Sequence, residues 1–182
     1  MTTYVIGVDA GTPALQEADH LLAELVRGLG LPEGGAAATH LIRTGTPRVA
    51  LSLTVSDPSR AAGLLPPGAR SVVRDEASAQ PDDGASQAAL AHGMQGRVVV
   101  FPGVDRLTGT LTVGEVLERS AIDEVAVLLG DPPAPETRLH TRDHVRPEWR
   151  DGRLTLLTMP AGPGRLAPYE VPDPTPCCAA HH

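Results

Sequence analysis

The sequence contains no lysine and no asparagine, so all 15 of its basic residues are arginine. Without lysine the protein has no Schiff-base nucleophile and no lysine-dependent phosphate loop. Without asparagine it has no catalytic role that depends on that side-chain amide. These absences remove several mechanisms before any motif is considered.

Aromatic residues are almost as scarce, with one Trp, one Phe and two Tyr. The core must therefore be built from Leu, Val, Ile and Ala, and recognition of nucleic acid by base stacking is disfavoured. The formal net charge of -7 also argues against binding to a nucleic-acid backbone, which depends on clustered cations. We predict no nucleic-acid partner, although net charge alone does not exclude a compact basic groove.

No apolar run approaches the roughly 18 residues that a membrane span needs, and the N-terminus has no basic flank or cleavage signature. We therefore predict a soluble, cytoplasmic protein without a membrane partner. Cys177 and Cys178 are adjacent, so they cannot join distant parts of one chain. A length of 182 residues predicts one domain with an appendage.

Residues 4–29 contain an apolar run, a short loop and a long amphipathic stretch. The spacing predicts a strand followed by a helix, with Thr12 as the N-cap and Pro13 at the first helical position. Gly30 predicts the end of this helix. Strand, tight loop and helix are the unit of an α/β fold.

The same pattern recurs as far as about residue 130. Further strands are predicted at residues 48–56, 97–101 and 124–129, and further helices at residues 58–64, 85–94 and 112–120. Asp57 before Pro58 and the capping box of Thr112 and Glu115 mark two of the helix starts. A strand, a helix and a strand within about thirty residues predict a right-handed parallel crossover. We therefore predict an α/β domain with a partly parallel sheet over residues 1–130.

The rest of the chain has a different texture. Residues 131–136 are Pro-rich and are predicted to form a linker, because proline continues neither helix nor strand. Residues 137–171 are expected to form an antiparallel, β-rich extension of the same domain, with a turn at Asp151 and Gly152. Its strands are predicted at residues 137–145, 153–159 and 165–171. Residues 172–182 are predicted to be a flexible tail.

Residues 6–12, Ile-Gly-Val-Asp-Ala-Gly-Thr, resemble the first phosphate motif of the actin, Hsp70 and sugar-kinase superfamily. The resemblance implies that Asp9 would serve metal and nucleotide chemistry while the Gly-Thr backbone approaches a phosphate. That family continues from the loop into a β-hairpin and has two lobes. Here Pro13 is predicted to begin a helix at once, and the chain is too short for two lobes. These departures favour turn geometry and helix capping for Gly11 and Thr12.

Aspartates follow several of the predicted strands. They are Asp9, Asp57, Asp105 and Asp131. In an open parallel sheet such residues gather along one edge, where ligands bind. Asp9, Asp105 and Asp131 could there hold Mg²⁺ for phosphoryl transfer or hydrolysis. The alternative is that these residues only cap helices and form turns, as aspartate does in many loops.

The C-terminal tail is rich in metal-ligand chemistry. Its thiols and imidazoles belong to Cys177, Cys178, His181 and His182. Such groups favour Zn²⁺ or Cu(I). His140 and His144 lie four residues apart in a predicted strand, so we expect them on one face, where the tail could complete a Cys2His2 set. Alternatives are a polar C-terminus without ligand, a truncated purification tag at the last two histidines, or a reducible disulfide.

The single Trp lies in a strongly charged segment at residues 142–150. Trp149, Arg146 and Arg150 could form a patch for a protein partner, because Trp and Arg contribute much of the binding energy at interfaces. Trp149 covering the end of the sheet, with solvated charges around it, is an equal alternative.

The sequence supports three classes of function. The leading hypothesis is a small metal- or partner-binding protein with a thiolate and imidazole site at the tail. The second is a Mg²⁺-dependent phosphoryl-transfer or hydrolytic enzyme that uses the aspartates. The third is a structural or interaction protein without a ligand.

Overall fold

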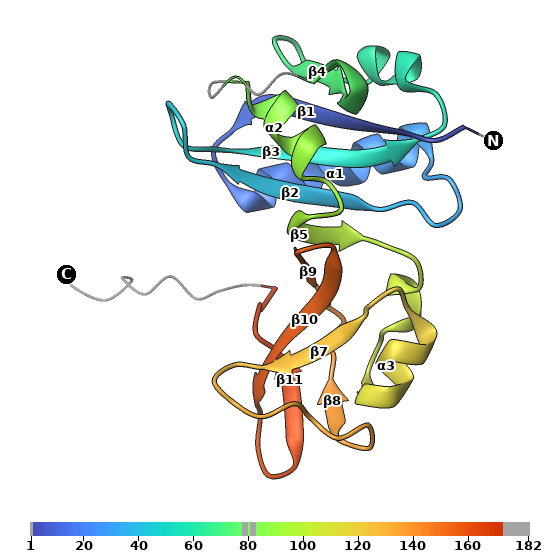
Figure 1. The fold of residues 1–182 in the computed structure, drawn as a ribbon, viewed down its shortest axis with the longest axis vertical. Helices are drawn as coiled ribbons and strands as arrows, with labels where there is room; N and C mark the ends of the chain where they lie inside the picture. The colour runs from blue at the N-terminus through green and yellow to red at the C-terminus, as the bar shows by residue number, and fades with distance from the viewer. Residues whose placement is uncertain (1, 78–79, 81–82, 173–182) are drawn as a thin grey trace.

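The computed structural model describes residues 2–77, 80 and 83–172, and in this part of the chain 11 strands form a single sheet (Figure 1). The strands are β1 (Tyr4–Thr12), β2 (Ala37–Ile42), β3 (Arg48–Val55), β4 (Arg70–Val73), β5 (Gln95–Val100), β6 (Thr110–Thr112), β7 (Glu124–Val127), β8 (Arg138–His140), β9 (Glu148–Arg150), β10 (Arg153–Pro160) and β11 (Arg165–Pro168). The α-helices are α1 (Leu15–Leu29), α2 (Gly84–Ala91) and α3 (Val113–Arg119). Shorter 3-10 helices are η1 (Pro58–Gly63), η2 (Arg74–Glu76) and η3 (Val104–Arg106).

The predicted α/β class is wrong, because the sheet is largely antiparallel. Neighbouring strands follow the order β4-β1-β3-β2-β5-β9-β10-β11-β8-β6, and β7 pairs with β10 outside this path. Among the strand pairs of the described residues, only β7 with β10 and β8 with β11 are parallel. The protein therefore has a mixed α+β fold.

The predicted crossover through α3 is also wrong. The strand that was predicted to precede the helix, β5, pairs with β2 and β9, whereas the strand after the helix, β7, pairs with β10. A further strand, β6, lies between β5 and α3 and pairs with β8. The local sequence predicted the elements correctly. Their partners come from segments far along the chain, which no local pattern specifies.

Helices cover both faces of the first half of the sheet. There β3 lies between β1 and β2, and α1 joins β1 to β2 in a split β-α-β arrangement. On one face α1 packs through Ala18, Leu22 and Leu25, which are fully buried. On the other face lies α2 (Figure 1), so close to β1 that a Cβ on Gly7 would fall 1.8 Å from the backbone oxygen of Ala85. Only Gly permits this approach.

The first strand is longer than predicted. It continues through Asp9 to Thr12, with an irregularity in its pairing to β3 just before Thr12. The helix begins at Leu15 after Ala14, which makes no side-chain cap, so Thr12 is not the N-cap. The predicted end is confirmed, because Gly30 terminates the helix with a φ of 69°.

Three other local signals are confirmed. Thr112 and Glu115 form the capping box at the start of α3. Asp57 caps η1 by accepting a hydrogen bond from a backbone N–H at 3.0 Å. Asp151 and Gly152 form the turn between β9 and β10, with φ values of 49° and 82°. Positive φ at both positions is what a two-residue hairpin turn requires.

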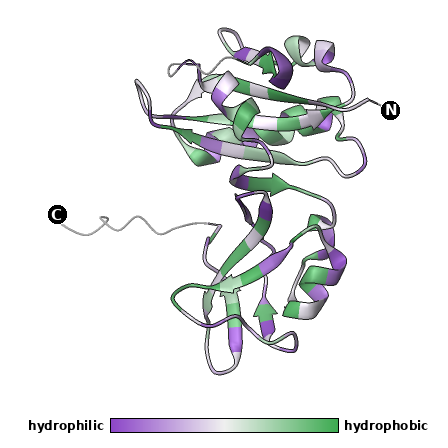
Figure 2. Cartoon of the chain, in the orientation of Figure 1, coloured by the Kyte–Doolittle hydropathy of each residue, from purple (hydrophilic) through white to green (hydrophobic). Residues whose placement is uncertain are grey.

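The second half of the sheet has an aliphatic core of its own. Val116 of α3 is fully buried against it, together with Leu139 and Leu156. Figure 2 shows hydrophobic and hydrophilic residues alternating along α3, as expected for a helix with one buried side. Residues 131–136 precede β8 and belong to no helix or strand. The division of the chain at this segment stays a prediction. None of the described helices combines the length and apolar character needed to cross a membrane.

Candidate anion-binding site

The strands β6, β8 and β11 lie next to one another and alternate between core-facing and outward-facing residues. The core-facing residues, each at most 8% exposed, are Leu111, Leu139 and Leu166. Their neighbours along each strand therefore share the outer face. Pairing places Thr110 opposite His140, and Arg138 opposite Arg165.

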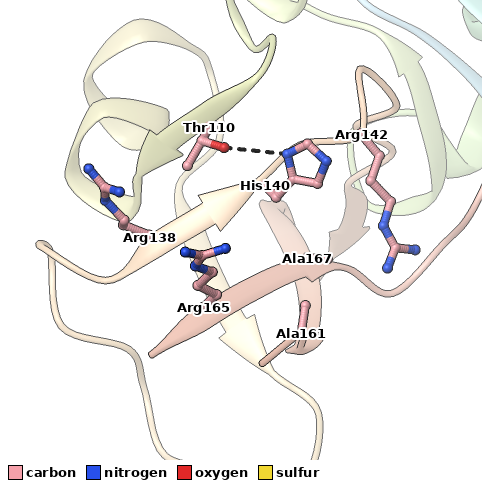
Figure 3. Close-up of a pocket in the computed structure, with 7 residues that line it drawn as sticks. All are labelled: Thr110, Arg138, His140, Arg142, Ala161, Arg165 and Ala167. Carbon is pink, nitrogen blue, oxygen red and sulfur yellow. Dashed lines mark hydrogen bonds between the residues drawn. The ribbon is translucent and has the colours of Figure 1, made fainter. Parts of the chain in front are cut away.

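A cavity of about 550 Å³ lies over this outer face (Figure 3). The residues that line it, called the arginine pocket below, are Thr110, Arg138, His140, Arg142, Ala161, Arg165 and Ala167. In the view of Figure 3 the guanidinium of Arg165 lies between the side chains of Arg138 and His140, and Arg142 lies beyond His140. Residues from three strands and two loops thus converge on one space.

The charge of this pocket is unbalanced. Its lining includes three guanidinium groups and no carboxylate. Within the described chain, none of the three arginines forms an ion pair. Arg138 and Arg165 are also direct neighbours on adjacent strands, where like charges destabilise a sheet by up to about 1 kcal/mol. The fold therefore holds together cations that repel one another.

Arg142 is held in the pocket by a tight turn after β8. Both Arg142 and Asp143 have positive φ, 56° and 51°, a conformation that non-glycine residues rarely adopt. Three hydrogen bonds to Gly109 stabilise the turn. Its N–H donates to Asp143 Oδ1 at 2.8 Å, and its carbonyl accepts from Thr141 Oγ1 at 2.9 Å and from the Thr141 N–H at 2.8 Å. Strained backbone of this kind is often found at binding sites.

His140 contributes an imidazole to the lining of the pocket. Its Nδ1 lies 3.4 Å from Thr110 Oγ1, the contact drawn in Figure 3. Arginine forks, a hydroxyl and an imidazole together are the groups that bind phosphate or carboxylate oxygens. The arrangement can therefore hold an anion.

The two histidines predicted to share a strand face are not placed that way. β8 ends at His140, and the chain turns before His144. The imidazole of His144 instead contacts Glu170 Oε1 at 3.0 Å through its Nε2. In the described residues no group of three or more His, Cys, Asp or Glu side chains could hold a metal ion. Cys177, Cys178, His181 and His182 lie outside the described residues.

The aspartates do not gather at one edge, because neighbouring strands run in opposite directions. Asp9 lies near the end of β1, whereas Asp57 follows β3, which is antiparallel to β1. Asp9 accepts from Nε of Arg48 at 2.7 Å, and both side chains are largely buried. Asp105 and Asp131 are exposed in η3 and in the loop after β7. Residues 6–12, which resemble a phosphate motif, belong to β1 and do not form the loop that the motif implies.

The predicted partner patch is divided between different environments. Trp149 packs edge-on against His92, with ring centroids 4.6 Å apart, and is partly buried against the second core. Arg150 forms an exposed ion pair of 3.2 Å with Glu148. Arg146 is partly buried and lines a separate groove. Trp149 thus lies on β9, between β5 and β10, and does not cover the end of the sheet, whereas a partner patch around it stays a prediction.

A buried series of hydrogen-bonded polar side chains under α2 was not predicted from the sequence. Ser52 Oγ lies 2.7 Å from both His40 Nε2 and His92 Nδ1, and Thr54 Oγ1 lies 3.3 Å from His92 Nε2. Burial lowers the pKa of His40 to about 4. Burial, with Arg74 and His40 nearby, lowers the pKa of His92 to about 3. Both imidazoles are therefore neutral at pH 7.

The arginine pocket was also missed, although the sequence contains a signal for it. Arg-Leu-His at residues 138–140 and Arg-Leu-Ala at residues 165–167 each place a buried Leu between two residues that line the pocket. The two triplets come together only because β8 and β11 pair, and that pairing was not predicted. Comparisons of the chain with family models, curated proteins and solved structures return no match. The candidate site therefore depends on geometry alone.

Proposed function

We propose that the chain binds a small phosphate-bearing molecule in the arginine pocket. The observation that supports this is the convergence of Arg138, Arg142 and Arg165 on one cavity in a protein of net charge -7. Guanidinium groups donate paired hydrogen bonds that match phosphate oxygens, and His140 and Thr110 add further polar contacts. A dianionic phosphate would also offset the repulsion between the neighbouring arginines.

The ligand is proposed to be a small molecule and not a nucleic acid. A cavity of about 550 Å³ falls within the usual range for small-molecule sites, about 300 to 1,000 Å³. The net charge of -7 opposes a long polyanion, and no aromatic ring lines the pocket for base stacking. The geometry supports binding better than catalysis, because no nucleophilic thiol or carboxylate lines the cavity.

Calorimetric titration with inorganic phosphate and with pyrophosphate, at constant ionic strength, tests this proposal. Replacing one charged hydrogen-bond donor in Arg165→Gln should weaken binding at least about tenfold. Arg106→Gln is a matched control, because Arg106 is also exposed but lies outside the pocket. Binding that is absent in the wild-type protein, or equal in both variants, would contradict the proposal.

A Zn²⁺ or Cu(I) site at the tail remains a second proposal. It is supported by the thiol and imidazole chemistry of Cys177, Cys178, His181 and His182. His140 is available at the arginine pocket, whereas His144 is engaged by Glu170. A metal and a phosphate would then compete for the same imidazole.

A further inference from the structure

A second cavity, of about 490 Å³, lies beside the start of α1 and is called the α1 groove below. Its apolar lining includes Leu15, Leu41, Leu157 and Tyr169. Leu41 is 61% exposed, Tyr169 53% and Leu15 40%. The groove thus combines an apolar surface with nearby arginines, unlike the arginine pocket.

One arginine of the α1 groove is fully neutralised. Arg97 donates to both carboxylate oxygens of Asp19, at 2.7 and 2.9 Å, and to both of Glu170, at 2.7 and 2.6 Å. These contacts join α1 to the segment that follows β11. Arg97 therefore has no remaining charge to offer a ligand.

Arg146 in the same groove forms no ion pair within the described residues. It is partly buried, and its Nη1 donates to the carbonyl of Val145 at 3.0 Å, a neutral acceptor. Its Nε is buried and has no hydrogen-bond partner among the described residues. Burial and the nearby Arg97 lower the pKa of Arg146, and the charges of Asp19 and Glu170 oppose this shift only in part. A partly buried guanidinium with no direct carboxylate contact and an unpaired N–H is costly, and an anion that binds there would lower that cost.

We infer that the α1 groove binds a small carboxylic acid with a hydrocarbon body. The carboxylate pairs with Arg146, and the hydrocarbon covers Leu15, Leu41 and Leu157. Arg43, an exposed lining residue without an ion pair in the described chain, adds positive charge at the rim.

A monoanion fits this groove better than a phosphate dianion. Glu148 and Glu170 also line it, and their charges would repel a second negative charge on the ligand. The exposed leucines gain only from an apolar body, which inorganic phosphate lacks. The α1 groove shares no lining residue with the arginine pocket, so a test that contradicts one proposal leaves the other unaffected.

Titration with hexanoate, followed by amide chemical shifts in NMR spectra of the full chain, tests the inference. Hexanamide lacks the charge and acetate lacks most of the hydrocarbon, so each should bind at least about tenfold more weakly than hexanoate. The largest shifts are expected around Gly96 and Arg146, which line the groove. Equal binding of hexanoate and hexanamide, or no shifts with hexanoate, would overturn the assignment.

Two variants locate the site. Arg146→Gln and Leu41→Gln should each weaken hexanoate binding at least about tenfold. Leu41 is 61% exposed, so its replacement leaves the core intact if Arg146→Gln unfolds the chain, and circular dichroism checks both. Arg165→Gln is the matched control and should retain hexanoate binding whatever it does to phosphate. Wild-type affinity for hexanoate in Leu41→Gln would refute the groove as the binding site.

Discussion

Mild acid should destabilise this protein through the buried chain of His40, Ser52 and His92. The two imidazoles are 7% and 8% exposed and Ser52 is fully buried, so a charge on either ring would lie away from water. Burial lowers the pKa of His40 from 6.5 to about 4 and that of His92 from 6.5 to about 3. Each ring therefore takes up a proton more readily in the unfolded chain than in the folded one.

The sign and size of the effect follow from these pKa values. Above pH 6.5 both rings are largely neutral in the folded and the unfolded chain, so the lowered pKa values do not affect the unfolding free energy. As the pH falls from 6.5 toward the pKa of the folded state, the unfolding free energy decreases. Between pH 7 and pH 5 the unfolded chain gains protons at both rings while the folded chain gains few. The expected loss in unfolding free energy is about 2 kcal/mol for each of His40 and His92. The sum is a large part of the 5 to 15 kcal/mol, roughly, that stabilises a typical domain.

Urea denaturation at pH 7 and at pH 5 measures this loss. Measurements stay at pH 5 or above because the lowered pKa values of Asp83 and Glu170 make carboxylate protonation destabilising at still lower pH. His92→Gln should lower stability at pH 7, since hydrogen bonds are lost, yet reduce the pH dependence by about half. Leu53→Val, at a buried site next to Ser52 on β3, should lower stability while keeping the wild-type pH dependence. Equal unfolding free energy at pH 5 and pH 7 in the wild-type protein would refute the reasoning.

Three further outcomes are expected. Gly7→Ala should destabilise the chain by about 3 kcal/mol or more in urea denaturation, because the new Cβ would lie 1.8 Å from a backbone oxygen of α2. An unchanged midpoint would show that α2 does not pack as described. Arg138→Thr should raise the melting temperature without phosphate, by relieving up to about 1 kcal/mol of repulsion, and should reduce the stabilisation that added phosphate gives. Removing Cys177 and Cys178 by replacement with Ser should abolish binding of Zn²⁺ or Cu(I) in equilibrium dialysis, and metal binding that persists would exclude the tail thiols as ligands.

Local chemistry was enough to predict many of the elements. The capping box of Thr112 and Glu115 and the Asp151-Gly152 turn are decided within a few residues, and both are present as expected. The strand around Leu51 was recognised from its alternation. Both faces of this strand are covered. The alternation alone did not indicate this, because α2, at Gly84–Ala91, is distant from the strand in the sequence.

Strand partners were not predictable in the same way. A strand such as β5 satisfies its hydrogen bonds equally well in a parallel or an antiparallel pair, so its sequence does not select β2 and β9. The wrong partners then led to the wrong candidate site. Asp9 and Asp57 were expected at one edge of a parallel sheet, whereas antiparallel pairing of β1 with β3 sends these two residues to opposite ends. The arginine pocket depends on the same kind of long-range information.

The contrast between paired and unpaired arginines is the strongest reason to regard the arginine pocket as a binding site. Two of the partly buried arginines are paired with carboxylates, Arg48 with Asp9 and Arg97 with two acids. A surface that only needed charge would mix the two signs. Around Arg138 and Arg165 the sheet instead places like charges in register, and the lining provides no acid. Such a local cost is expected at functional sites, where an anion from outside the chain completes the arrangement.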